Sequence, residues 1–312
     1  LMALVGAMTI FSGGAMAQPA PGPVTLMVPF APGGGNDILA REIGHLLADT
    51  LKTSVVIDNR SGAGGLVAAK AVSTAKPNGS TLLFVSSSFV TTTAGRKVEP
   101  YDVVKDFTPL AKLAGSPLLV VASHQSGINS IQDIISRSKQ NPGSLNFVSS
   151  GVGSILHLAT EVFMHKAGVK MTHVPYTGSG PALMDLVAGR ADVFVTAIPT
   201  VLGQLQDKSL KLVAVTGEAR SSLYPDAPTL IEQGLPGLTL ETWWMKAPLS
   251  SAEQARISRN PLSRNTQTGA ASSSRANSTQ TELLSLPQPA TKSRSPSCAG
   301  FNGLARDLDW PS

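Results

Sequence analysis

The stretch Val24-Thr-Leu-Met-Val-Pro-Phe-Ala-Pro-Gly-Gly-Gly-Asn-Asp37 decides the fold prediction. Residues 24–30 form an apolar run typical of a buried strand, and the three glycines after it permit a tight turn. Asn36 or Asp37 can cap a helix, and apolar residues then recur at helical spacing as far as Leu51. A helix that begins at a glycine turn presents free N–H groups and the positive end of its dipole, so this stretch predicts an anion site.

Two phosphate-binding motifs are excluded at this turn. A P-loop requires Gly-Lys-Ser/Thr, where this chain has Asn36-Asp37. The glycine spacing of a dinucleotide fingerprint is absent from residues 33–39 and from residues 62–68. The alternative interpretation of the stretch is an ordinary strand-to-helix turn of an α/β domain.

The same unit of strand, glycine turn and helix recurs along the chain. Strands are predicted at 54–58 and 81–85, with a glycine turn at 59–65 and a helix at 66–75. This β-α-β-α-β series favours a parallel sheet, in which ligands gather at the carboxyl ends of the strands. Those ends are residues 32–37, 59–65 and 86–88.

A second series of such units follows from residue 130. It contains helices at 130–139, 155–167 and from Pro181, strands at 145–149, 171–176, 191–196 and 210–216, and glycine turns at 149–154 and 177–180. We therefore predict two α/β lobes, with chain crossings near 114–124 and 212–222.

Composition excludes several classes of protein. The chain has 312 residues, 42% of them hydrophobic and 14% charged, which suits a globular protein with a substantial core. Of the net charge of +5, residues 251–312 carry +3, so the rest is nearly neutral and nucleic-acid binding is not indicated. One cysteine, Cys298, excludes an internal disulfide and a cysteine zinc cluster, and the histidines have no spacing typical of a metal site.

The two ends of the chain differ from its body. Residues 1–11 are apolar, and Ala15-Met-Ala17 resembles a signal-peptidase site, so we predict that residues 1–17 are a clipped export signal. The alternative is a buried N-terminal helix. Residues 258–297 are rich in Ser, Thr, Asn, Gln, Arg and Pro, which predicts a disordered or frame-shifted tail within 251–312.

Specific residues resemble a known family, the periplasmic receptors of tripartite tricarboxylate transporters, often called the Bug family. The matching stretches are 28–37, 58–65, 76–83, Ser149-Ser-Gly-Val-Gly-Ser154 with His157, 173–192, 226–236 and Trp243-Trp244. The resemblance covers residues 24 to about 250 and ends there. It implies a two-lobed periplasmic-binding-protein fold (type II, Venus-flytrap) with a hinged cleft, a small carboxylate as ligand, a membrane permease as partner, and neither catalysis nor a cofactor.

The site predicted from the residues agrees with this resemblance. Glycine turns at helix N-termini in both lobes can hold a carboxylate by backbone N–H groups and neutral hydroxyls, each contributing about 1–3 kcal/mol. The predicted ligand-binding residues are Phe30, Pro32, Gly33, Gly34, Asp37, Ser86, Ser87, Ser150, Gly151, Ser154, Thr177, Gly178 and Ser179.

Other polar residues are better explained by structural roles. Asp37 is first a helix cap, with contact to a ligand hydroxyl or amino group as the alternative, and His157 is first a packed or capping residue. Arg60 and Arg190 are expected to be solvated. Asp185 and Asp192 could imitate the paired carboxylates of a hydrolase, but their places on a helix and before a strand favour structural roles.

Alternative functions remain open at this point. A serine hydrolase of small esters could use an exposed serine, although Gly-x-Ser-x-Gly is absent. A regulatory lobe joined to a DNA-binding domain would need a helix-turn-helix, for which the sequence before Val24 leaves no room. The atypical tail allows an inactive, truncated receptor. We predict lobe I at 24–121 plus 222–250 and lobe II at 122–221; dicarboxylates, amino acids, nicotinate-like acids and aromatic acids all suit the site.

Overall fold

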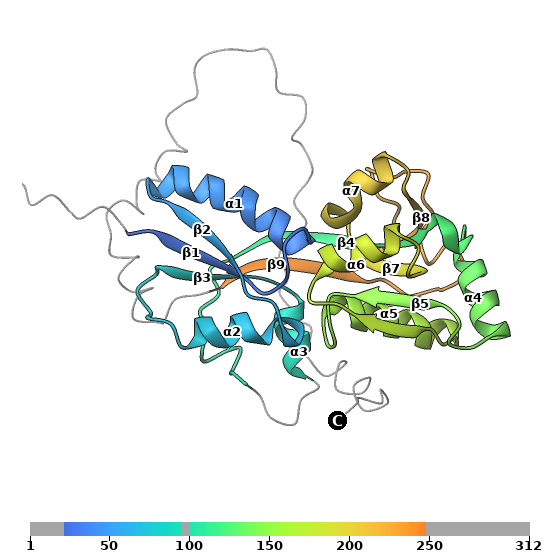
Figure 1. Ribbon diagram of the computed structural model, residues 1–312, viewed down its shortest axis with the longest axis horizontal. Coiled ribbons are helices and arrows are strands. Elements are labelled where there is room, and N and C mark those ends of the chain that lie inside the picture. The colour runs from blue at the N-terminus through green and yellow to red at the C-terminus, as the bar shows by residue number, and fades with distance from the viewer. Residues whose placement is uncertain (1–21, 95–99, 248–312) are drawn as a thin grey trace, which may run out of the picture.

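The computed structural model describes residues 22–94 and 100–247, which form two α/β lobes side by side (Figure 1). The predicted export signal at 1–17 and the predicted tail at 251–312 lie outside the described residues. The α/β, two-lobed prediction is confirmed. Within the described ranges, no helix combines the length and the apolar character that a bilayer-spanning helix needs.

The strands form one hydrogen-bonded series, and one long strand within it separates two groups of strands. The order is β2-β1-β3-β9-β4-β7-β5-β6, and β8 also pairs with β4. The first group contains β1 (Val24–Val28), β2 (Val55–Asn59), β3 (Thr81–Ser86) and β9 (Glu241–Ala247). The second group contains β5 (Asn146–Ser149), β6 (Thr172–Pro175), β7 (Val193–Ala197) and β8 (Leu210–Val215).

Strand β4 (Ala111–Ser123) belongs to both groups. From Ala111 to Pro117 it pairs with β9, and from Leu118 onward it lies between β7 and β8. Figure 1 shows β4 and β9 running from one lobe toward the other. The change of partner at Pro117 falls within the predicted crossing at 114–124.

The return crossing differs from the prediction of 212–222. Residues 210–215 remain in the second lobe as β8, and the chain returns only at Leu240, whose N–H donates to the Thr216 carbonyl. The buried Thr216 hydroxyl accepts from the Leu118 N–H at 2.8 Å and donates to the Leu240 carbonyl. One side chain therefore joins both crossings.

Residues 222–240, assigned from sequence to the first lobe, form their contacts with the second. The Leu230 N–H donates to the Val215 carbonyl, and Gln233 hydrogen bonds to Ile131 and to Val213. This segment lacks periodic apolar spacing, so its place depends on contacts distant in sequence.

Helices cover both faces of each sheet (Figure 1). In the first lobe, α1 (Gly35–Leu51) lies on one face, and α2 (Leu66–Ser73) and α3 (Ser88–Ala94) lie on the other. The second lobe carries α4 (Ile131–Gln140), α5 (Ile155–Ala167), α6 (Ser179–Val187) and α7 (Ile198–Gln206). Two short 3-10 helices, η1 (Ala63–Gly65) and η2 (His124–Ser126), complete the described elements.

The core follows the alternation of side chains along buried strands. In β1, Leu26 and Val28 pack in the large cluster that includes Ala40 of α1, whereas Met27 packs in a smaller cluster with Leu66 of α2. Strands β1, β2 and β3 run parallel in the first lobe, as do β5, β6 and β7 in the second, so the carboxyl ends of each set lie at one edge of their sheet.

Candidate functional site

A small cavity lies between the lobes, where the carboxyl ends of the parallel strands meet. It has a volume of about 20 Å³, close to what one water molecule needs. None of the described residues that line this cavity is charged. They are Phe30, Gly34, Gly35, Asn36, Ser86, Ser88, Ser150, Ile155, Leu156, Ser179, Ala197, Thr200 and Thr242.

Four helices of eight residues or more begin at this cavity. The first residues of α1, α5 and α6 line it, as does Thr200 in the first turn of α7. Each helix N-terminus carries about half a positive charge from its aligned peptide dipoles. The cavity is therefore electropositive without any lysine or arginine, which suits a small anion.

The turn before α1 is fixed by a carboxylate. Asp37 is buried; one of its oxygens accepts from the Gly33 N–H and the Arg41 Nε, both at 3.0 Å. The other accepts from Arg41 at 2.9 Å and from the Asn59 side chain at 3.0 Å. Burial raises the pKa of Asp37, but the hydrogen bonds from Arg41, Gly33 and Asn59 outweigh burial and hold it below its usual value. Asp37 thus supports the turn and does not line the cavity.

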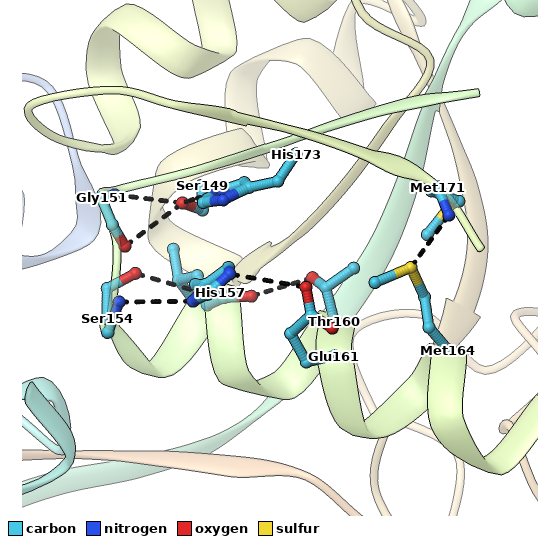
Figure 2. Close-up of polar contacts among 11 residues, drawn as sticks. Ser149, Gly151, Ser154, His157, Thr160, Glu161, Met164, Met171 and His173 are labelled. Carbon is cyan, nitrogen blue, oxygen red and sulfur yellow. Dashed lines mark hydrogen bonds and ion pairs between the residues drawn. The ribbon is translucent and has the colours of Figure 1, made fainter. Parts of the chain in front are cut away.

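The turn before α5 is fixed by hydroxyl groups and imidazoles (Figure 2). The Ser154 hydroxyl accepts from the His157 N–H at 3.3 Å as the helix cap, and the His157 ring accepts from the Gly153 N–H at 3.3 Å. The Ser149 hydroxyl accepts from the Gly151 N–H at 3.1 Å and lies 2.7 Å from Nε2 of His173.

The two imidazoles stack on each other next to this turn. Their ring centres are 4.1 Å apart, and Phe147 stacks on His173 at 4.7 Å. Burial first, and the neighbouring His157 second, lower the pKa of His173 to about 4, while Glu161 acts in the opposite direction. His173 is therefore a neutral support at pH 7.

The structure brings together five of the residues predicted to bind the ligand. Phe30, Gly34 and Ser86 from the first lobe and Ser150 and Ser179 from the second all line the cavity. Ser87 does not, because its hydroxyl accepts from the Trp243 N–H of β9 at 3.0 Å. Ser154 does not either, because it caps α5.

The remaining predicted residues lie at the lobe contact or at the mouth of the site. Gly151 and Thr177 line a more open hollow of about 450 Å³, which shares Ser150 with the inner cavity. Pro32 and Gly33 face Gly180, and a Cβ on Gly178 would lie 2.7 Å from the Ala31 nitrogen. These glycines let backbone meet backbone where the lobes touch.

The sequence prediction missed Asn36, Ser88, Thr200 and Thr242, all of which line the cavity. Thr200 follows the end of β7 as Ser150 follows the end of β5, so the rule of strand ends could have found it. Thr242 lies on the returning strand β9 and carries no such signal.

The second lobe contains one serine–histidine pair, and it is not arranged for catalysis. Ser149, beside His173, is fully buried and its hydroxyl already bonds the Gly151 backbone. Asp185 pairs with Arg190 and accepts from the Tyr176 hydroxyl, and Asp192 accepts from the Asn146 N–H at 2.7 Å. Among the described residues, no group of three His, Cys, Asp or Glu could hold a metal ion.

Comparison with known proteins defines the class. Residues 39–256 match the family described as "Tripartite tricarboxylate transporter family receptor". The chain is 34% identical over 225 residues to Protein BugT of Bordetella pertussis, covering 71% of this chain and 69% of that protein. Across four such curated relatives, the chain spans 64–69% of their length.

Solved structures of similar proteins agree. Rpa4515 of R. palustris with adipate has a TM-score of 0.74 at 33% identity, covering 81% of this chain and 84% of that one. MatC from Rhodopseudomonas palustris with bound malate has a TM-score of 0.71 at 30% identity, covering 81% and 85%. The chain belongs to the receptor family of tripartite tricarboxylate transporters, a family of periplasmic solute-binding receptors and not of enzymes.

Proposed function

We propose that this protein is a periplasmic receptor that binds a small carboxylate between its lobes and delivers it to the membrane permease subunits of a tripartite tricarboxylate-type transporter. The observation that carries the proposal is the convergence of four helix N-termini on one neutral, hydroxyl-lined cavity. A carboxylate there would accept from backbone N–H groups and hydroxyls, which bind an anion yet allow it to leave.

The two lobes would move as bodies about the paired crossings. We draw the division where the hydrogen bonds change partners, with residues 22–94, 100–117 and 241–247 in lobe I and residues 118–240 in lobe II. Thr216 lies between Leu118 and Leu240 at this division. A cavity of about 20 Å³ cannot hold a dicarboxylate, so the lobes must separate for a ligand to enter.

Relatives suggest which acids to test. One neighbour is described with adipate and another with malate, so both acids are suitable probes for this chain. Export by the predicted signal at 1–17 would deliver the receptor to the periplasm, where such ligands enter.

The test is a melting screen of small carboxylic acids that includes malate and adipate, together with an assay of ester hydrolysis. We expect at least one acid to raise the Tm, with no turnover of p-nitrophenyl esters. Ester hydrolysis that depends on Ser149 or on a cavity serine would contradict the receptor proposal and support a serine hydrolase.

The cavity hydroxyls provide the sharper test, because Ser86 and Ser150 come from different lobes. Replacing either by Ala should weaken binding of the acid found in the screen by about 1–3 kcal/mol if the hydroxyl donates to a carboxylate. Unchanged calorimetric affinity in both variants would place the ligand elsewhere.

A further inference from the structure

Helix α3 carries a row of hydroxyl side chains, and only the first of them, Ser88, lines the cavity. Ser88, Thr91 and Thr92 are spaced i, i+3 and i+4, which places them on one face of the helix. Between them, Phe89 packs into the first lobe, against Tyr101 at 5.3 Å and Phe107 at 4.9 Å between ring centres. The helix is thus anchored in its own lobe.

The hydroxyl row reaches the turn before α5 in the second lobe. The Ile155 N–H donates to the Ser88 hydroxyl at 3.0 Å, and the Thr91 hydroxyl donates to the Gly153 carbonyl at 3.1 Å. Thr92 contributes less, because its hydroxyl is 2.7 Å from the Ser88 carbonyl of its own helix and 3.3 Å from that of Gly153.

A hydroxyl of the second lobe makes the same kind of contact with a helix of the first lobe. Helix α1 begins after Gly34, which has no side chain to cap it, and its Gly35 N–H donates instead to the Thr200 hydroxyl at 3.0 Å. Each lobe therefore supplies a hydroxyl that caps the first amide of a helix in the other. Ser88 and Thr200 are 3% and 4% exposed, so both bonds are shielded from water.

We propose that Ser88, Thr91 and Thr200 form a clasp that holds the lobes together and sets the width of the closed cleft. In an open form these amides and hydroxyls would bond to water instead. Each clasp hydrogen bond therefore favours closure only by its net strength over a bond to water, which raises the closed-to-open ratio about 2- to 12-fold. Because Ser88 and Thr200 line the cavity beside Ser86 and Ser150, the clasp also positions the cavity walls. Only its consequence for ligand affinity rests on the proposed function.

The lobe distance tests the clasp before any acid is added. Spin labels at Leu46→Cys on α1 and Met184→Cys on α6, both positions 66% exposed, report lobe separation in the full chain with Cys298→Ser. Thr91→Val and Thr200→Val keep the side-chain shape and remove the hydroxyl. Each should lower the ratio of short to long distances about 2- to 12-fold, and the double variant should lower it further.

Two threonines serve as matched controls. Thr93 lies on α3 but its hydroxyl bonds only the Val90 carbonyl of the same helix, and the Thr160 hydroxyl bonds the Leu156 carbonyl within α5. Thr93→Val and Thr160→Val should leave the distance distribution unchanged, whatever they do to the Tm. The clasp is overturned if the Thr91 and Thr200 variants give the parent distribution, or if the control variants change it equally.

A second readout separates this inference from the proposed function. The clasped form leaves a cavity of only about 20 Å³, so malate or adipate must separate the lobes to enter. Their affinities should therefore rise in the Thr91 and Thr200 variants in parallel with the loss of the short distance, because a smaller share of the protein is held in the form that excludes the ligand. If neither acid, nor any other in the screen, binds the parent protein, the proposed function fails while the distances still decide the clasp. If an acid binds and its affinity is unchanged in open-shifted variants, the positioning role is excluded.

Discussion

The turns before α1 and α5 have the same design in sequence but different support in the structure. Both follow a buried strand, contain glycines and begin a helix at the cavity. The first is held by a carboxylate with a guanidinium and an amide, Asp37 with Arg41 and Asn59. The second is held by the hydroxyls of Ser149 and Ser154 and by a stacked pair of imidazoles.

The turns also meet the opposite lobe differently. Residues 31–34 contact the second lobe mainly through backbone, as when the Ala31 N–H donates to the Thr177 carbonyl at 3.2 Å. The turn at 151–155 meets hydroxyl side chains of α3. The same sequence unit is therefore stabilised in two different ways. Added side-chain bulk should disturb the contact of residues 31–34, and a change of polarity or pH should disturb the contact of residues 151–155.

The largest expected effect is from Gly180→Ala at the backbone contact. A Cβ on Gly180 would lie 2.2 Å from the Pro32 carbonyl oxygen, so the closed form must shift. Overpacking of about 1–3 kcal/mol predicts a closed-to-open ratio lower by about 5- to 150-fold, which the spin-label distances between the lobes would measure. The Tm should not fall in step, since alanine favours helix over glycine by up to about 1 kcal/mol.

Gly203→Ala is the matched control. Gly203 also lies in a helix of the second lobe, but a Cβ there meets nothing within 4 Å. It should gain helix stability and keep the parent's distance distribution. Equal distance distributions of the two variants would show that residues 31–34 and 178–180 do not meet in the closed form.

The next largest effect is expected on the stability of the protein when the Asp37 carboxylate is replaced. Asp37→Asn removes the charge that Arg41 and the Gly33 N–H recognise, and should lower the free energy of unfolding by about 1–3 kcal/mol, the lower end being expected because Arg41 is half exposed. Asp58→Asn, at an exposed ion pair, is the control. Urea unfolding at pH 7 would measure both, and equal small losses would contradict the role of Asp37.

The pH dependence of this loss has a definite sign. The pKa of Asp37 is lowered from 3.8 in the folded state, so its contribution is complete above that value and is lost as pH falls through the folded pKa. The difference between parent and Asp37→Asn should therefore shrink only at strongly acid pH.

How far sequence alone could predict the fold is shown by two helices. Residues 155–167 were predicted as a helix capped by Ser154, and α5 spans Ile155–Ala167 with that cap. Helix α3 was missed, because Val90 and Thr91 to Thr93 are β-branched and disfavour helix. It forms because Phe89 packs with Tyr101 and Phe107, residues that local spacing cannot bring together.

The strands show the same limit. The parallel strands were predicted from apolar runs, but Gly115 and Pro117 broke the pattern of β4, and β9 has no alternation that predicts a strand. For the site, the rule of strand ends placed Ser86 and Ser150 at one cavity. Which hydroxyls instead hold structure, as Ser87 and Ser154 do, depends on partners distant in space.

A smaller effect is expected at the imidazole support. The pKa of His173 is lowered to about 4, chiefly by burial and then by His157, whereas an unfolded histidine has 6.5. As pH falls from 6.5 to 4 the unfolded chain takes up this proton first, so the folded state loses stability across that window. His173→Gln should reduce the fall in Tm between pH 7 and 4.5.

His165→Gln is the control for this pH effect, because His165 is exposed on the same helix as His157. Its Tm should follow pH as the parent's does. Identical pH profiles for His173→Gln and the parent would mean that burial does not keep the His173 imidazole neutral across this window.

The smallest expected effect is at Arg60, the cation nearest in sequence to the glycine turn at 62–65. Its side chain is 51% exposed and pairs with Asp58 at 2.9 Å, and it lines neither the inner cavity nor the outer hollow. Exposed ion pairs contribute about 0–1 kcal/mol, and the helix N-termini already supply the positive potential at the cavity. Arg60→Ala should therefore weaken acid binding less than about tenfold, and less than Ser150→Ala does in the same calorimetric series. Loss of all binding with an unchanged Tm would show that Arg60 pairs directly with the ligand, and that the site needs a full charge where the comparison of the two turns indicates only dipoles and hydroxyls.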